Sequence, residues 1–168
     1  MDQIIIFCAQ YLVFLVILAA GIYWLTLARR QKVSFMVFGL IAGITAYLLA
    51  KVGGTLFDNP RPFVNNNVVP LFTHAADNGF PSDHTLFTAV IAATVWSFSK
   101  KWGVVFFAFC IIVGGSRVLA HVHHVIDIVG AIGFAVLGAA VAYAATKKLL
   151  HAKTNRLHGT TKNSTHHL

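Results

Sequence analysis

The chain has 168 residues, of which 57% are hydrophobic and 11% are charged, and its formal net charge is +8. The high hydrophobicity excludes an intrinsically disordered protein, and the apolar runs around Cys8 and Cys110 exclude a disulfide-stapled secreted domain. In a soluble protein this positive charge would suggest nucleic acid, but the apolar content indicates an integral membrane protein that binds none.

Apolar segments in chain order predict an all-α bundle of five transmembrane helices. A helix needs about 20 mostly apolar residues to cross the hydrocarbon core of a bilayer. The segments are 4–28, 33–57, 85–99, 102–120 and 125–146, and the third is the shortest. The first segment is too long for a cleaved signal peptide and follows the acidic Asp2. We therefore expect one transmembrane domain over residues 1–150 and a disordered, basic tail over 151–168.

The basic residues orient this bundle. All Lys and Arg side chains except Lys51, Arg61 and Arg117 fall on one side of the predicted helices. The positive-inside rule assigns that side to the cytoplasm, so the N-terminus is expected outside and the C-terminus inside. The glycine-rich stretch 130–138 predicts close helix packing.

The three remaining basic residues share the outer face with histidines and carboxylates. Arginine binds phosphate oxygens in pairs and lysine adds a point charge, so Lys51, Arg61 and Arg117 predict a site for a phosphate-bearing substrate. His123 and Asp127 are four residues apart, which places both on one face of a helix. The carboxylate can then hold one ring nitrogen and leave the other as a nucleophile.

A second polar group, Pro81-Ser82-Asp83-His84, precedes the third predicted helix. Ser82 or Asp83 can cap that helix, and the amides at a helix N-terminus attract anions. His84 would stand at the same place as a proton donor.

These residues resemble the three signatures of the type 2 phosphatidic acid phosphatase (PAP2) superfamily. Ser116-Arg117, His123 and Asp127 match the third signature in spacing, and Pro81-Ser82-Asp83-His84 resembles the second, which usually reads Pro-Ser-Gly-His. Lys51 through Arg61-Pro62 resembles the first, with nine intervening residues where the family has six. Asp83 in place of glycine looks like the bacterial undecaprenyl-diphosphate phosphatase branch.

The resemblance implies a PAP2-like bundle in the bacterial plasma membrane, with its site facing the periplasm or the extracellular side. It also implies phosphoryl transfer without metal or cofactor, in which His123 attacks phosphorus, Asp127 stabilises the imidazolium and His84 protonates the leaving oxygen. The phosphate-binding residues that it implies are Lys51, Arg61, Ser82, Asp83 and Arg117.

The implied substrate is a lipid phosphate drawn from the surrounding membrane lipids. The resemblance favours undecaprenyl diphosphate, cleaved to undecaprenyl phosphate and inorganic phosphate in recycling the carrier lipid for cell-wall synthesis. Phosphatidylglycerophosphate, phosphatidic acid and other lipid phosphates are alternative substrates, and the sequence does not indicate an oligomeric state.

Other interpretations of the same residues remain open. Imidazole and carboxylate also bind zinc or iron, as in a metal-binding membrane protein or a histidine-rich transporter. That site would use His121, His123, His124 and Asp127. Arg61 can be a loop charge, Lys51 can extend its ammonium to the membrane surface and Asp83 can be a simple helix cap. His74 and Asp77 fall in the long polar loop, where solvated side chains or a substrate lid are both consistent with the sequence.

Overall fold

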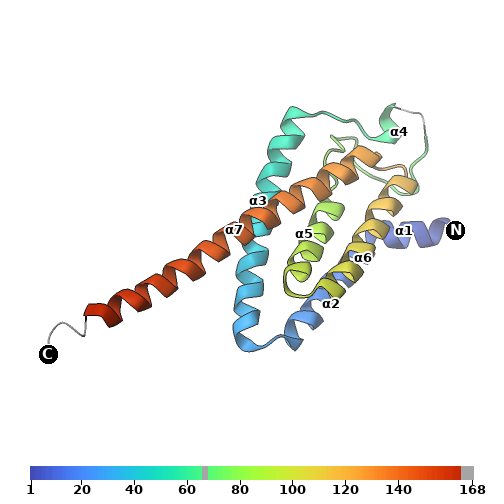
Figure 1. Ribbon diagram of the computed structural model, residues 1–168. Helices are drawn as coiled ribbons and strands as arrows, with labels where there is room; N and C mark the ends of the chain where they lie inside the picture. Colours follow the sequence, from blue (N-terminus) through green and yellow to red (C-terminus); the bar gives the residue numbers. More distant parts are fainter. Residues whose placement is uncertain (66–67, 164–168) are drawn as a thin grey trace.

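The computed structural model describes residues 1–65 and 68–163, with side chains described as far as residue 147, and these residues form helices joined by loops (Figure 1). The helices are α1 (Asp2–Gln10), α2 (Leu12–Thr26), α3 (Arg29–Leu56), α4 (Pro62–Asn65), α5 (Asp83–Phe98), α6 (Lys100–Leu119) and α7 (Val125–Asn163).

Among the described residues, three helical segments are long and apolar enough to cross a membrane, namely α3, α6 and the 125–147 part of α7. The number becomes four if α1 and α2 count as one bent span. The remaining predicted span corresponds to α5, whose 16 residues extend about 24 Å, less than the roughly 30 Å of a hydrocarbon core. The all-helical architecture is thus as expected, whereas the fifth span is not among the helices of sufficient length.

Helix α5 occupies the centre of the bundle, where it packs against α2, α3, α6 and α7. Half of its length is buried, largely through small residues such as Ala89, Ala92 and Ala93. Ser99 ends the helix in an extended conformation, and its hydroxyl accepts a hydrogen bond from the Trp102 amide to begin α6. Neighbouring helices thus cover part of α5, while Phe87 and Trp96 remain exposed.

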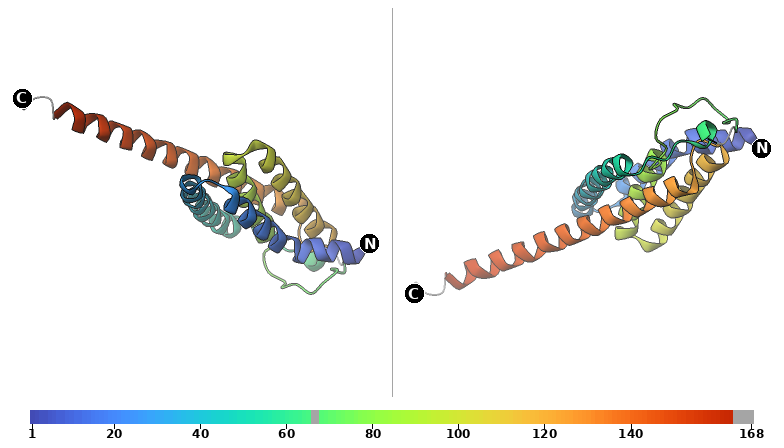
Figure 2. Two further views of the ribbon diagram at one scale, coloured as in Figure 1. Left: turned by 90° about the horizontal axis from the view of Figure 1, so that it is seen from below. Right: turned by 90° about the horizontal axis from the view of Figure 1, so that it is seen from above.

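Helices α3 and α7 pack closely against each other. A side chain at Gly138 would overlap the Ala42 carbonyl, and Ala46 lies within 3.1 Å of the same position. The two helices therefore approach closely where small residues face each other, which confirms the packing expected from the glycine-rich stretch. Figure 2 shows α7 continuing beyond the bundle.

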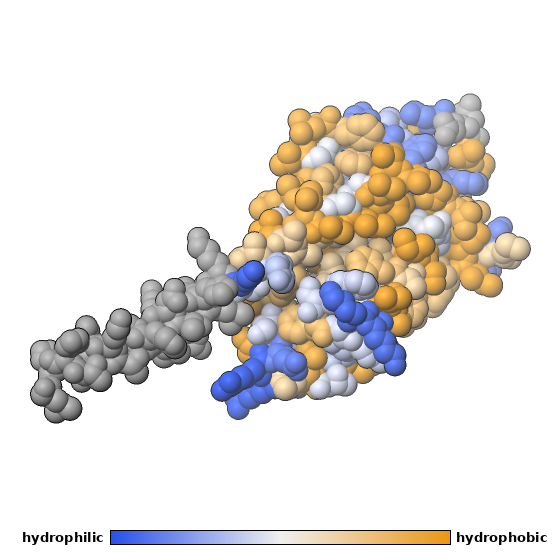
Figure 3. Space-filling model, viewed as in Figure 1, coloured by the Kyte–Doolittle hydropathy of each residue, from blue (hydrophilic) through white to orange (hydrophobic). Residues whose placement is uncertain are grey.

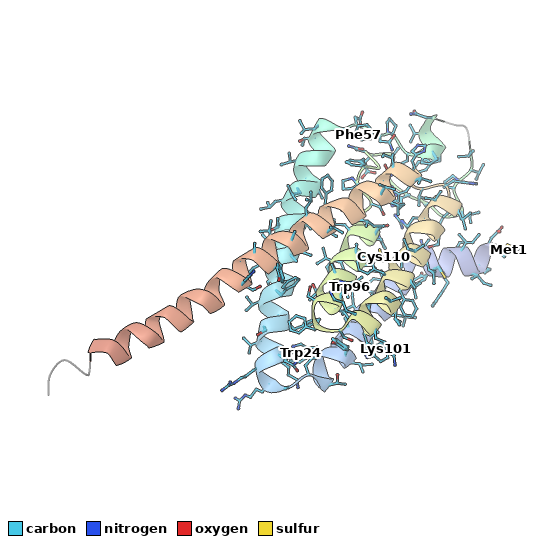
Figure 4. The ribbon with its side chains drawn as sticks, in the orientation of Figure 1. Met1, Trp24, Phe57, Trp96, Lys101 and Cys110 are labelled. Carbon is cyan, nitrogen blue, oxygen red and sulfur yellow. The ribbon has the colours of Figure 1, made fainter. Side chains whose placement is uncertain are left out.

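The two ends of the bundle are polar, and its sides are apolar (Figure 3). At one end, Lys32 lies 5.2 Å from the Trp24 ring and Lys100 lies 4.6 Å from the Trp96 ring. Figure 4 places Trp24 and Lys101 at this end and Phe57 at the opposite end, where the polar loop lies. This separation matches the charge asymmetry used to orient the chain.

Two segments differ from their expected form. The predicted helix 4–28 is broken at Tyr11 into α1 and α2, which meet at 50°, and the Ala9 carbonyl at this bend accepts a hydrogen bond from Arg117. The expected disordered tail from 151 is helical backbone as far as Asn163, continuous with α7, while residues 164–168 lie outside the described residues.

Candidate active site

The centre of the site is a buried histidine–carboxylate pair. His123 lies in the turn before α7, and its Nδ1 is 3.2 Å from Asp127 Oδ2 in the first turn of that helix. Asp127 Oδ2 also accepts the His124 amide at 2.8 Å, so the carboxylate caps the helix as it holds the ring. The expected pairing is present, but a helix N-terminal turn produces it, because His123 precedes the first residue of α7.

Two arginines converge on the other nitrogen of this ring. Arg61 Nη1 lies 3.1 Å and Arg117 Nη2 lies 3.3 Å from His123 Nε2. Guanidinium groups only donate hydrogen bonds, so Nε2 is the acceptor and Nδ1 carries the proton that is donated to Asp127. This tautomer leaves the Nε2 lone pair as the nucleophilic one, aimed between two cations.

Both guanidinium groups make further hydrogen bonds. Arg61 donates from Nη1 to the Val122 carbonyl at 2.8 Å and from Nε to Asp77 at 2.8 Å. Arg117 donates from Nη1 to the Ala9 carbonyl at 3.3 Å, and its buried Nε has no hydrogen-bond partner among the described residues. Cations held in this way are pre-organised for a group with several negative oxygens.

The surroundings keep His123 neutral. Burial lowers the pKa of His123 from its ordinary value of 6.5, and the Arg117 and Arg61 guanidinium groups lower it further, although the Asp127 hydrogen bond acts in the opposite direction. A neutral imidazole at neutral pH is the form that can attack an electrophile.

This cluster opens into a polar cavity of about 350 Å³. Arg61, Arg117 and His123 line it, together with His84 from the first turn of α5. The three expected catalytic residues therefore lie together. His84 and His123 line the same cavity, and Asp127 contacts His123.

The other expected phosphate-binding residues lie in different surroundings. Ser82 occupies the N-cap position of α5, but its hydroxyl accepts from Thr85 at 3.1 Å, and it is fully buried and does not line this cavity among the described residues. Asp83 and Lys51 do line the cavity, at its edge toward the bundle side, and the Lys51 ammonium lies 5.2 Å from the Tyr47 ring.

An apolar groove begins at that edge. It has a volume of about 910 Å³ and runs between α2, α3 and α5. Tyr47, Lys51 and Asp83 line both the groove and the polar cavity, so the two are adjoining. The site therefore joins a cationic pocket to a long apolar surface.

Two further polar residues support the site. Asn59 Nδ2 donates to Asp127 Oδ1 at 2.7 Å, and Asn78 Oδ1 accepts from the Asn59 amide at 3.0 Å. Asn78 Nδ2 also donates to the Gly54 carbonyl at 2.8 Å, tying the end of α3 to the loop. Sequence analysis missed both, and the only signal was the closeness of Asn59 to Arg61 in the chain.

His121 and His124 have hydrogen-bond partners outside the His123–Asp127 pair. His121 Nδ1 lies 3.1 Å from the Val69 carbonyl, and His124 Nε2 lies 3.2 Å from the Pro60 carbonyl. Over the described residues, no group of three or more His, Cys, Asp or Glu is arranged to hold a metal ion. Within this part of the chain, the residues of the alternative metal site therefore do not converge on one point.

Comparison with known proteins places this geometry in a family. The family model described as the PAP2 superfamily matches residues 32–150. The chain is 31% identical over 150 residues to "Bacitracin transport permease protein BcrC" of Bacillus licheniformis, covering 89% of this chain and 73% of the relative. It is 29% identical over 140 residues to "Undecaprenyl-diphosphatase BcrC" of Bacillus subtilis (strain 168), covering 82% and 70%.

A solved structure shows the same fold. The crystal structure of Aquifex aeolicus LpxE superposes with a TM-score of 0.67 at 21% identity, covering 85% of each chain. The family match and the relatives show that the chain belongs to the PAP2 superfamily of membrane lipid phosphatases.

Proposed function

We propose that this protein hydrolyses undecaprenyl diphosphate to undecaprenyl phosphate and inorganic phosphate through a phosphohistidine on His123. The observation that carries the proposal is the placement of His123 Nε2 between the Arg61 and Arg117 guanidinium groups, with Nδ1 on Asp127. The Bacillus subtilis relative, whose name gives this activity, supports the choice of substrate.

In the first step, the terminal phosphoryl group of the substrate enters between the two arginines. Their N–H groups turn from His123 Nε2 to the phosphoryl oxygens, which frees the Nε2 lone pair to attack phosphorus in line. The bond from phosphorus to the bridging oxygen breaks, its electron pair stays on that oxygen, and His84 donates a proton to it. Asp127 stabilises the resulting imidazolium, in keeping with a reaction that depends mainly on positioning and electrostatics.

In the second step, water takes the place of the departed lipid phosphate. His84, now neutral, accepts a proton from this water as its oxygen bonds to phosphorus. The phosphorus–nitrogen bond breaks and its electron pair returns to His123 Nε2, releasing inorganic phosphate. The proposed route needs neither metal nor cofactor.

The apolar groove supports a lipid substrate. Its lining is mainly aliphatic and aromatic, with Phe35, Leu40 and Leu86 among its residues, and it adjoins the polar cavity at Lys51. A polyprenyl chain in this groove would place its diphosphate beside His123. Lys51 then lies where the phosphate that stays on the lipid would sit.

The proposal includes a location in the bacterial plasma membrane with five spans, N-terminus outside and C-terminus inside. This topology counts α1 with α2 as one bent span and α5 as a short, enclosed one. The active site then faces the periplasm or the extracellular side, where recycling of the carrier lipid for cell-wall synthesis would require it.

Transport is the second candidate function, because the name of the Bacillus licheniformis relative refers to a bacitracin permease. Hydrolysis distinguishes the two candidates directly, since a permease has no need of a nucleophilic His123. The same assay shows whether the protein cleaves undecaprenyl diphosphate, phosphatidylglycerophosphate or phosphatidic acid.

The experiment measures phosphate release from each lipid in detergent with EDTA, for the wild type, His123→Ala and the control His121→Asn. His121 has a φ of 59°, which asparagine tolerates, and its ring lies outside the catalytic cavity. We expect EDTA-resistant release from undecaprenyl diphosphate that is lost only in His123→Ala. Full activity of His123→Ala would refute the role of His123 as the nucleophile. Cleavage of another lipid phosphate but not of undecaprenyl diphosphate would refute the proposed substrate.

A further inference from the structure

The loop from 68 to 79 places a side chain against each arginine of the site. Asp77 accepts a hydrogen bond from Arg61 Nε at 2.8 Å. His74 Nε2 lies 2.8 Å from Arg117 Nη2, and the Phe72 ring lies 5.6 Å from the Arg117 guanidinium carbon. The His74 ring is also 6.2 Å from the His123 ring, edge to face, and lines the polar cavity.

The donors around His74 define its tautomer. Arg117 Nη2 can only donate, so His74 Nε2 accepts and the ring proton is on Nδ1, which lies 3.4 Å from the Ala75 carbonyl. Nη2 carries two hydrogens, and it contacts both His74 Nε2 and His123 Nε2. One hydrogen can therefore turn to a phosphoryl oxygen while the other stays on His74.

We infer that His74 is a positioning residue of the reaction, whose neutral imidazole holds the Arg117 guanidinium with Nη2 facing the phosphoryl group on His123. This inference rests on the proposed phosphatase function and adds a residue outside the three family signatures.

Few other contacts control the orientation of this guanidinium. The Ala9 carbonyl accepts from Nη1 at 3.3 Å, Phe72 covers one face, and the buried Nε lacks a described partner. Without the bond to His74, the Arg117 guanidinium would keep two hydrogen bonds within the described structure. One is the contact with His123 Nε2, and the other is the 3.3 Å contact with the Ala9 carbonyl. Rotation about Cδ–Nε would then displace Nη2 from the reacting phosphoryl group.

Protonation of His74 would remove this contact, because Nε2 would become a donor facing another donor. The charged or titratable groups around the ring are Arg117 from α6, Arg61 before α4, His123 before α7, His84 from α5 and Asp77 in the same loop. Burial, followed by the charges of Arg61 and Arg117, lowers the pKa of His74. The neutral form that the geometry requires is therefore the one present at neutral pH.

The test compares His74→Gln and His74→Leu with the wild type in the lipid phosphatase assay. The glutamine oxygen can accept from Arg117 without titrating, whereas leucine cannot accept at all. We expect His74→Leu to lower kcat/KM about tenfold, the usual effect of losing a hydrogen bond to a charged group, and His74→Gln to keep most of the activity. Equal activity of the leucine variant and the wild type would overturn the inference.

The pH profile separates positioning from a merely structural role. Protonation of His123 gives the acid limb of log kcat/KM a slope of about one, and protonation of His74 should add a further fall of about tenfold, which His74→Gln should remove. A glutamine variant with the same acid limb as the wild type would contradict the inference. If the leucine variant does not fold, this measurement on the glutamine variant still decides the question.

Binding of inorganic phosphate tests the inference without catalysis. A ligand that binds the folded protein raises its melting temperature. We expect phosphate to stabilise the wild type and His74→Gln more than His74→Leu, and equal shifts would contradict the role of His74. If the wild type binds phosphate but cleaves no lipid phosphate, the proposed function is refuted, and the comparison of phosphate binding still tests whether His74 holds Arg117.

Discussion

Asn59 Nδ2 donates a 2.7 Å hydrogen bond to Asp127 Oδ1, which links the segment before Arg61 to the carboxylate that orients His123. With the His124 amide on Oδ2, this bond fixes both oxygens of the carboxylate. The conformation of His123 thus depends on a loop residue that lies 68 positions before Asp127 in the chain.

Replacing Asn59 should impair catalysis. Asn59→Leu removes the donor from Asp127 Oδ1, and a hydrogen bond to a charged group contributes about 1.5–3 kcal/mol. We expect kcat to fall at least about tenfold, since each 1.4 kcal/mol corresponds to a factor of ten. Exposed Asn65 offers a matched control, and Asn65→Leu should leave kcat unchanged. Equal rates for both variants would show that Asp127 needs no support from Asn59.

The pH dependence of activity should reflect a neutral nucleophile. Because burial and the two arginines lower the pKa of His123, kcat/KM should stay high on acidification until the pH falls below 6.5. In Asp127→Asn the carboxylate no longer raises this pKa, so the acid limb should move to still lower pH while the maximum rate falls. A profile of kcat/KM against pH for both proteins checks this, and a limb above 6.5 would contradict it.

Packing at Gly130 should affect stability and activity together. A side chain at Gly130 would overlap the Phe80 ring, which precedes the Pro81–His84 segment. We expect Gly130→Ala to destabilise the fold by about 1–3 kcal/mol, the usual cost of overpacking, and to lower kcat. Gly133 has nothing within 4 Å of its added Cβ, so Gly133→Ala is the control. Thermal unfolding in detergent measures the difference, and equal melting temperatures would argue against it.

Filling the apolar groove should discriminate between substrates by chain length. Gly43 lines the groove, and an added Cβ would make ordinary contact with Val90 at 3.7 Å. Gly43→Leu should raise KM for undecaprenyl diphosphate while leaving hydrolysis of the shorter farnesyl diphosphate nearly unchanged. Gly133→Leu is the size-matched control. A uniform change for both substrates would indicate that the groove does not hold the lipid chain.

The sequence predicted that Arg117, His123 and Asp127 converge, because these residues lie close together in the chain. His123 and Asp127 share one turn, and Arg117 lies six positions earlier at the end of the preceding helix. Such local spacing already restricts the geometry, so the convergence of these residues could be inferred without coordinates. The apolar runs likewise predicted the helices, since a membrane requires long hydrophobic segments.

Residues supplied by loops could not be predicted in the same way. Asn59 and His74 reach the site from a segment without hydrophobic periodicity, and their roles depend on tertiary contacts with Asp127 and Arg117. His74 was therefore assigned either to solvated polarity or to a lid, although it contacts a buried arginine. The side chain of Ser82 also differs from expectation, because its hydroxyl accepts from Thr85 and makes no capping hydrogen bond to α5.

The bend at Tyr11 also escaped the hydropathy pattern. Residues 4–28 carry no charge and Gln10 is an isolated polar residue in them, so hydropathy alone does not predict the 50° angle between α1 and α2. Arg117 satisfies the Ala9 carbonyl at this position, and that partner lies 108 positions away.

That contact has a consequence for the smallest catalytic unit. The family match begins at residue 32, yet Ala9 supplies an acceptor to Arg117, and Ile17 and Ala20 line one wall of the apolar groove. A chain shortened to 32–150 would keep every signature residue and lose both a hydrogen-bond acceptor of Arg117 and one wall of the apolar groove. We therefore expect the smallest active unit to be larger than the family core and to include the first two helices.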